Sequence, residues 1–194
     1  MEHYFTNNEN LESHPVELTC WCGSRKLIFN SDSGVFSSRE IDDASLALVR
    51  HIGPLSGKVL DLGCGYGFIG IYLAAKYDGI FLTQSDVNRR ALSLCRSNCS
   101  SNGICSEIVE SDGFDHLPES FDHILLNPPI HAGKDIVYRL YDEAYAHLEP
   151  GGCFYIVIRK KHGAESSRRH LEDLGFSCEV LTSEKGIMVY RFVK

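Results

Sequence analysis

The sequence lacks the features that are typical of membrane proteins, secreted proteins and proteins stabilised by bound metal. Its uncharged apolar runs, such as Phe154 to Ile158, fall far short of the ~20 residues that a membrane helix needs. Met1 to Tyr4 lack the basic start of a signal peptide. The 8 cysteines include no C-x-x-C pair, which argues against both a zinc site and a disulfide framework. We therefore expect a cytoplasmic protein that holds no metal.

An excess of basic residues is also missing. The chain has 19 Lys and Arg against 26 Asp and Glu, a formal charge of −7, so it is not a polycation built to coat nucleic acid. A nucleic-acid role would need a local basic patch. The 194 residues are 43% apolar and 23% charged and contain no biased tract, which predicts one globular domain over residues 1–194.

The spacing of two cysteines indicates packing. Ala91, Cys95 and Cys99 recur every four residues within a predicted helix. Cysteine behaves as a small hydrophobic residue when it is buried. We expect these side chains to lie on the buried face of that helix.

Strand and helix patterns alternate along most of the chain. Predicted strands cover 58–62, 80–85, 106–110, 121–126 and 153–158, and predicted helices cover 68–76, 88–102, 135–148 and 164–174. This alternation predicts right-handed crossovers and a parallel sheet with helices on both faces. Strands 177–182 and 187–193 follow as a hairpin, so we expect a doubly wound α/β fold whose seven-stranded, mostly parallel sheet ends with an antiparallel strand.

Two features precede this core. Residues 16–30 are β-prone around Gly23-Ser24, which predicts a hairpin within an N-terminal extension, 1–36, of a catalytic core, 37–194. Ser37 to Glu40 match a capping box, which predicts a helix opening there with Ile41, Leu48 and Ile52 on one face.

A glycine-rich turn follows the first predicted strand of the sheet. Residues 59–70 read VLDLGCGYGFIG, a buried strand, a turn and the start of a helix. Glycine allows so tight a turn and lets a ligand approach the backbone, and the helix start offers unpaired amides, so we expect a polar or anionic ligand. Gly65, Gly67 and Gly70 also approach the spacing of the NAD fingerprint, which leaves an NAD-dependent oxidoreductase as an alternative.

Acidic residues follow three successive strands. Asp61, Asp86 and Asp112 lie at or near the ends of the first, second and third strands of the predicted sheet. The carboxyl ends of neighbouring parallel strands line one crevice, so these acids are expected to form a row along it. An ionised carboxylate only accepts hydrogen bonds, which suits Asp86 to the two hydroxyls of a ribose.

The fourth strand ends in Asn127-Pro128-Pro129. Two prolines stop a strand and present its last carbonyls rigidly. The side-chain carbonyl of Asn127 and the backbone carbonyl of Pro128 could hold an amino group attached to a flat conjugated system. That grip turns the nitrogen lone pair toward an electrophile without a general base. The NAD alternative leaves these residues unexplained.

Together, Asp61 to Gly67, Asp86, Asp112 and Asn127 to Ile130 resemble the class I S-adenosylmethionine-dependent methyltransferases that modify exocyclic or amide nitrogens. Residues 33–37 and 127–134 are further similar to the small-domain family whose best-known members methylate guanine N2 in small-subunit ribosomal RNA. The resemblance runs from about His3 to the C-terminus. It implies a Rossmann-like methyltransferase with S-adenosylmethionine as cofactor and RNA, as ribosomal RNA or a ribosomal particle, as partner.

The resemblance also implies roles for individual residues. Those expected to bind the cofactor are Asp61, Gly63, Cys64, Gly65, Gly67, Asp86, Val87, Asp112, Gly113 and Asn127. Asn127, Pro128 and Pro129 are the expected catalytic residues. The resemblance also places Ile130 against the substrate. From their positions near the predicted crevice, rather than from the resemblance, we expect substrate contacts from Phe36, His131, Lys134, Arg159 and Lys160. Ile130 stands where many such enzymes have an aromatic residue, and the N-terminal RNA-binding domain of larger relatives is not expected in this chain.

Two alternatives stay open beside RNA methylation. A glutamine side-chain amide of a protein is also a flat nitrogen that Asn127 and Pro128 could hold. A cofactor-binding but non-catalytic ribosome-assembly module fits the acidic charge balance and Ile130.

Overall fold

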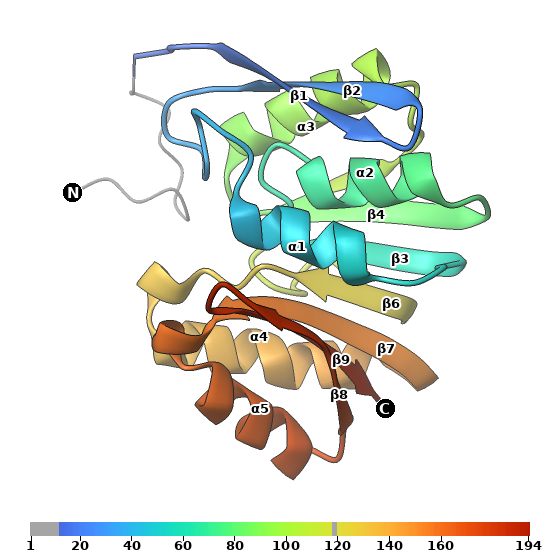
Figure 1. The fold of residues 1–194 in the computed structure, drawn as a ribbon, viewed down its shortest axis with the longest axis vertical. Helices are drawn as coiled ribbons and strands as arrows, with labels where there is room; N and C mark the ends of the chain where they lie inside the picture. Colours follow the sequence, from blue (N-terminus) through green and yellow to red (C-terminus); the bar gives the residue numbers. More distant parts are fainter. Residues whose placement is uncertain (1–11, 118–119) are drawn as a thin grey trace.

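A seven-stranded sheet forms the centre of the computed structural model, which describes residues 12–117 and 120–194 (Figure 1). Its strands are β3 (Gly57–Leu62), β4 (Ile80–Asp86), β5 (Glu107–Glu110), β6 (Phe121–Leu126), β7 (Leu148–Arg159), β8 (Ser177–Glu184) and β9 (Ile187–Val193). They lie in the order β5-β4-β3-β6-β7-β9-β8. β9 is antiparallel to both β7 and β8, and the other pairings are parallel. The predicted sheet is confirmed, with β9 inserted between two strands that precede it in the chain.

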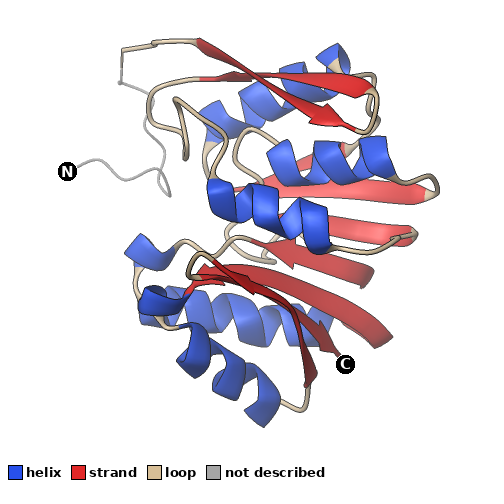
Figure 2. Cartoon of the chain, viewed as in Figure 1, coloured by secondary structure: helices blue, strands red, loops and turns tan. Residues whose placement is uncertain are grey.

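Helices cover both faces of this sheet (Figure 2). They are α1 (Asp43–His51), α2 (Phe68–Lys76), α3 (Arg89–Ser101), α4 (Lys134–His147) and α5 (Ala164–Asp173), with short 3-10 helices η1 (Ile130–Ala132) and η2 (Lys160–His162). Side chains alternate between the faces, so Val59 of β3 joins a core with α1, α2 and α3, whereas Leu60 and Leu62 join a core with α4 and α5. The doubly wound prediction is confirmed. No helix in the described ranges is long and apolar enough to cross a membrane.

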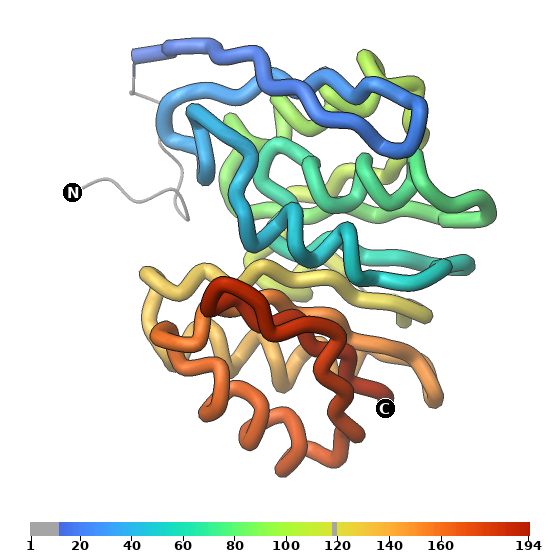
Figure 3. Tube along the Cα trace, in the orientation of Figure 1, coloured from blue at the N-terminus to red at the C-terminus, as the bar shows by residue number. Residues whose placement is uncertain are grey.

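The N-terminal hairpin lies over the helices rather than in the sheet (Figure 3). β1 (Val16–Cys22) and β2 (Arg25–Ser31) pair around the predicted turn. Leu27 and Phe29 are fully buried in the core that contains α2 and α3. The predicted hairpin is confirmed, while residues 1–11 of the predicted extension lie outside the described residues.

The prediction for the buried cysteines is confirmed. Cys95 is 0% exposed and Cys99 is 5% exposed, and both belong to the core under α3. The hydrogen bond with Cys64 and burial raise the pKa of the Cys95 thiol, and the hydrogen bond with Cys95 and burial raise the pKa of the Cys99 thiol. Both side chains therefore stay neutral and pack as small apolar groups.

Two predicted boundaries are wrong. α1 begins at Asp43 rather than directly after Glu40, because the carboxylate of Asp42 accepts from the backbone N–H of Ser45 and caps the helix. Ser37 has a φ of 56°, and its hydroxyl donates to the carbonyl of Glu40 instead of capping a helix. Ile41 therefore precedes the helix.

The second boundary is the start of β7. It begins at Leu148, five residues before the predicted strand, because Phe121 pairs with Leu148 and His123 with Cys153. The residues between these pairs form an irregularity in the strand. Gly151 has a φ of 80°, and its N–H donates to the carbonyl of Lys194, so the irregularity is anchored beside the last strand.

Candidate active site

A pocket of about 320 Å³ opens at the carboxyl ends of β3, β4 and β6. The strand order reverses between β3 and β6, because the chain proceeds from β3 to β4 and β5 on one side and to β6 and β7 on the other. Such a switch point leaves a crevice outside the strand ends. The volume lies within the range of sites that hold small molecules.

The glycine-rich turn supplies one wall of this pocket. Gly63, Gly65 and Gly67 have φ values of 65°, 57° and 91°, in the left-handed region that glycine adopts without strain. A Cβ at Gly67 would lie 2.7 Å from the Sγ of Cys95, so the turn packs directly on α3. Gly63 and Gly65 line the pocket, while Gly67 begins α2 behind it. Bare backbone therefore faces any ligand.

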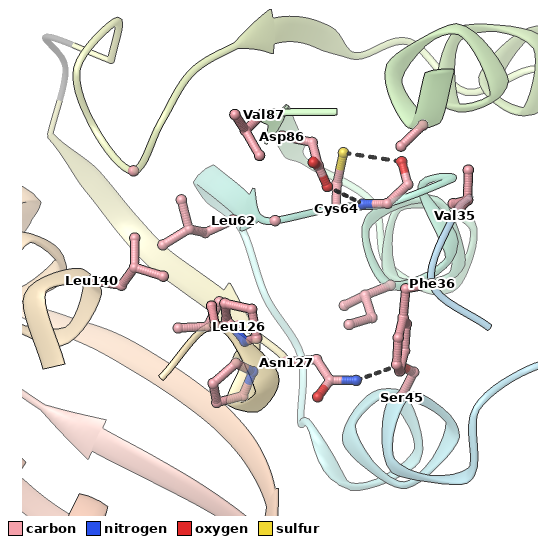
Figure 4. Close-up of a pocket in the computed structure, with 18 of the residues that line it drawn as sticks. Val35, Phe36, Ser45, Leu62, Cys64, Asp86, Val87, Leu126, Asn127 and Leu140 are labelled. Carbon is pink, nitrogen blue, oxygen red and sulfur yellow. Dashed lines mark hydrogen bonds between the residues drawn. The ribbon is translucent and has the colours of Figure 1, made fainter. Parts of the chain in front are cut away.

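Asp86 lies next to this turn at the end of β4 (Figure 4). Its Oδ2 accepts from the N–H of Gly65 at 2.8 Å, and its Oδ1 accepts from the N–H of Asn88 at 2.8 Å. Burial raises the pKa of this carboxyl, and backbone hydrogen bonds, including one from Val87, oppose the shift. Asp86, Val87 and Cys64 all line the pocket.

Asp61 lies behind the pocket wall rather than in it. Its Oδ2 accepts from the N–H of Gly70 at 2.8 Å and from Nε2 of Gln84 at 3.3 Å. Burial raises the pKa of Asp61 to about 7, and Oδ1 is buried without a hydrogen-bond partner among the described residues. Asp61 thus ties β3 to the start of α2, and its expected contact with the cofactor remains a prediction.

Asp112 lies in a more open part of the pocket. Its side chain is 62% exposed, and Nη2 of Arg139, on α4, donates to its Oδ1 at 2.5 Å. Gly113 lines the pocket beside it. Sequence reasoning missed Arg139, because no motif signals an ion pair between residues 27 positions apart.

The Asn-Pro-Pro segment lies across the pocket from Asp86. Asn127, Pro128 and Pro129 all line it. Nδ2 of Asn127 donates to Oδ2 of Asp42 at 3.2 Å and to Oγ of Ser45 at 3.1 Å. Sequence reasoning missed Asp42 and Ser45, because the local pattern favours a capping box at residues 37–40. The sequence did contain a signal for this cap: Asp42 is a favoured N-cap residue and directly precedes the helical pattern.

The residues expected to contact substrate divide into two groups. Phe36 lines the pocket, together with Ile136 and Tyr66, which sequence reasoning did not select. The others flank it on η1, on the start of α4 and on or beside η2: Ile130, His131, Lys134, Arg159 and Lys160. The rings of His131 and His162 lie 6.4 Å apart, so η1 and η2 are neighbours. Nη2 of Arg159 lies 4.0 Å from Oδ1 of Asp42.

Comparison with known families identifies the fold. The model of the family described as "Methyltransferase small domain" matches residues 26–191. The chain belongs to this methyltransferase family. Membership confirms the methyltransferase class and the S-adenosylmethionine cofactor expected from the sequence, and it decides against the NAD-dependent oxidoreductase.

Individual relatives refine the comparison. The "Uncharacterized protein YbxB" of Bacillus subtilis is 36% identical over 100% of this chain and 98% of its own length. "Ribosomal RNA small subunit methyltransferase C" of Hamiltonella defensa is 39% identical over 77% of this chain and 52% of its own length. The corresponding protein of Pasteurella multocida is 40% identical over 64% of this chain and 39% of its own length. The chain thus spans about half or less of the curated relatives that carry this name.

A solved structure has the same architecture. The 16S rRNA N2 G1207 methyltransferase of T. thermophilus, in complex with AdoMet and guanosine, superposes with a TM-score of 0.82 and 26% identity. The match covers 95% of this chain and 52% of that protein. The predicted resemblance to the small-subunit ribosomal RNA methyltransferases is confirmed.

Proposed function

We propose that this protein transfers a methyl group from S-adenosylmethionine to an exocyclic amino nitrogen of RNA, with guanine N2 of ribosomal RNA as the target. The observation that carries the proposal is that Asn127 and Pro128 share one pocket with Asp86 and the glycine turn. An acceptor pair for an amine therefore faces a wall suited to a nucleoside. The names of the ribosomal RNA methyltransferases that resemble the chain support the same reaction.

The wall around Asp86 fits the cofactor. The bare backbone of Gly63 and Gly65 allows close approach, and the Asp86 carboxylate can accept from a vicinal diol. Leu140 and Val87 add apolar contact for a base, and Asp112 is within the same lining. When bound, the cofactor supplies an electrophilic methyl group.

The target end acts by holding the amine. The carbonyl of Pro128 accepts from the N–H of Ile130 at 2.9 Å and has a second lone pair. That lone pair and Oδ1 of Asn127 would accept the two N–H bonds of the amine, which would direct the nitrogen lone pair toward the methyl group at near-attack distance. As the C–N bond formed and the C–S bond of the sulfonium broke, leaving a neutral thioether, positive charge would develop on the nitrogen and the same two oxygens would stabilise it. The nitrogen then loses a proton to water, so no general base is needed.

The RNA backbone is expected to lie over η1 and η2. Arg159, Lys160, Lys161 and His162 form the basic segment beside the pocket, and Lys134 and His131 lie on the neighbouring segment. Contacts with phosphate position a nucleic acid without specifying its sequence. We also propose that residues 1–194 act as one methyltransferase domain, since the hairpin packs into the core that contains α2 and α3.

The test is a methylation assay with labelled S-adenosylmethionine on undermodified small ribosomal subunits and on free protein factors. We expect label in ribosomal RNA at guanine N2, located by mass mapping of nucleosides. Asn127→Ala should lower turnover by about 100-fold or more, because the amine loses its fixed position, with cofactor affinity within a few-fold of wild type.

Each alternative has its own outcome in this assay. Label in protein alone would favour methylation of a glutamine amide, which the same two oxygens could hold. Cofactor binding without turnover on either substrate would favour a non-catalytic assembly module. Full activity of the Asn127→Ala variant would contradict the catalytic assignment.

A further inference from the structure

The orientation of the Asn127 amide depends on α1. Both acceptors that its Nδ2 contacts, Oδ2 of Asp42 and Oγ of Ser45, belong to the start of this helix, at 3.2 and 3.1 Å. Oγ of Ser45 also donates to Oδ2 of Asp42 at 3.2 Å, so the amide nitrogen, the hydroxyl and the carboxylate form one hydrogen-bonded triangle. Figure 4 shows the nitrogen turned toward Ser45 and the oxygen turned away from it. No side chain or backbone amide of the described residues donates a hydrogen bond to that oxygen.

The reversed amide would be unfavourable. An amide oxygen in the place of Nδ2 would face the carboxylate of Asp42, and two acceptors cannot share a hydrogen bond. Asp42 is itself held in place from two other directions. Its Oδ2 accepts from the N–H of Ser45 at 2.8 Å, and its Oδ1 lies 4.0 Å from Nη2 of Arg159. The acid therefore lies where the ends of β6 and β7 meet the start of α1.

We propose that Asp42 and Ser45 are positioning residues that force Asn127 to present its oxygen, and not its nitrogen, to the target. This inference rests on the proposed function, in which that oxygen accepts from the target amine. A fixed acceptor oxygen at this place favours a target that donates a hydrogen bond, so the arrangement would help the enzyme to select an amino nitrogen as its target. The same acid caps α1, so the start of that helix and the target end of the pocket are built by one carboxylate.

Suitable substitutions can remove the contacts with Asn127 while leaving the start of α1 intact. Asp42→Ser keeps a good N-cap oxygen for α1, but a serine is too short to reach Asn127. Ser45→Ala removes the second acceptor and keeps a good helix former. Asp43→Ser is the matched control, since Asp43 lies in the first turn of the same helix and, within the described residues, makes no hydrogen bond to Asn127.

We expect Asp42→Ser to lower kcat by about 10-fold, because the amide then samples both orientations. Ser45→Ala should lower kcat by less, because Asp42 still opposes the reversed amide, and the double variant should lose more than either. The KM for RNA, the Kd for S-adenosylmethionine and the thermal midpoint should change little. Asp43→Ser should resemble wild type in all four measurements. A loss confined to stability or to cofactor binding would overturn the proposal.

A reciprocal exchange supplies a second test that does not depend on capping. Asn127→Asp sets a carboxylate against Asp42 and leaves no N–H between them, so turnover should fall. Adding Asp42→Asn restores one donor between the two side chains and should recover at least about 10-fold of the lost kcat. A double variant no better than Asn127→Asp alone would refute the positioning role.

Failure of the inference and failure of the proposed function give different results. An active Asn127→Ala variant contradicts the proposed function itself. If Asn127→Ala is inactive while Asp42→Ser and Ser45→Ala match wild type, the reaction stands and the positioning role is wrong. Where Asp42→Ser does not fold, Ser45→Ala and the reciprocal exchange decide.

Discussion

The two ends of the pocket, named for the roles proposed above, are built in different ways: the cofactor end contains Asp86 and the glycine turn, and the target end contains Asn127. At the cofactor end, the backbone does the positioning: Asp86 accepts from the N–H groups of Gly65 and Asn88, and the glycine turn packs against α3. At the target end, side chains position one another, since Asn127 is held by Asp42 and Ser45. Backbone amides therefore fix the carboxylate of Asp86, whereas side chains from the start of α1 fix the amide of Asn127.

Breaking the backbone fit at the cofactor end should have the largest effect. Gly67→Ala adds a Cβ 2.7 Å from the Sγ of Cys95 at a φ of 91°, so close packing and backbone strain add together. We expect the free energy of unfolding to fall by about 3 kcal/mol. Gly23→Ala is the control, because its φ is 60° and nothing lies within 4 Å, and it should cost about 1 kcal/mol. Urea unfolding measures both, and equal losses would show that the turn is not tightly packed.

The buried carboxylate behind the glycine turn gives a pH-dependent test. Burial raises the pKa of Asp61 to about 7, whereas an unfolded aspartate titrates near pH 4. The folded protein therefore holds this proton where the unfolded chain has lost it, so this group's contribution to stability falls as pH rises from about 4 to 7. The slope is at most about 1.4 kcal/mol per pH unit.

Asp61→Asn should remove that contribution. The free energy of unfolding of the wild type minus that of the variant should decrease between pH 5 and pH 8, as measured by urea unfolding at each pH. The other titrating groups are common to both proteins and cancel in the difference. A constant difference for Asp61→Asn across this range would contradict the raised pKa.

The smallest expected effects are on S-adenosylmethionine affinity, where the buried Asp86 can be compared with the exposed Asp112. Asp86→Asn should weaken S-adenosylmethionine binding by about 2 kcal/mol, or about 30-fold, because a buried acceptor held by amides is lost. Asp112→Asn should cost about 1 kcal/mol or less, since that side chain is 62% exposed and already shared with Arg139. Calorimetric titration measures both affinities. Equal losses would show that burial does not distinguish the two acids.

The sheet could be predicted from the sequence because its signals are local. Alternating strands and helices determine a doubly wound order, and Asp86 and Asn127 end strands that must meet at one edge. The ligand pocket follows from that geometry.

The contacts between elements could not be predicted in the same way. Arg139 reaches Asp112 across 27 positions and Asp42 meets Asn127 across 85, and no periodicity reports such pairs. The predicted start of α1 is wrong for a related reason, since Ser37 and Asp42 are both acceptable caps and the tertiary contact with Asn127 favours Asp42. The motif predicts that Asp61 contacts the cofactor. Its side chain instead lies behind the pocket wall, where its Oδ2 accepts a hydrogen bond from the N–H of Gly70.

The place of β9 between β7 and β8 has a consequence for biosynthesis. A chain leaving the ribosome releases β8 before the strand that must separate it from β7. Until residue 193 has emerged, β7 exposes an open edge and β8 has no proper neighbour. An unpaired strand edge can pair with another chain, so a chaperone that shields bare edges would protect the nascent protein during this interval.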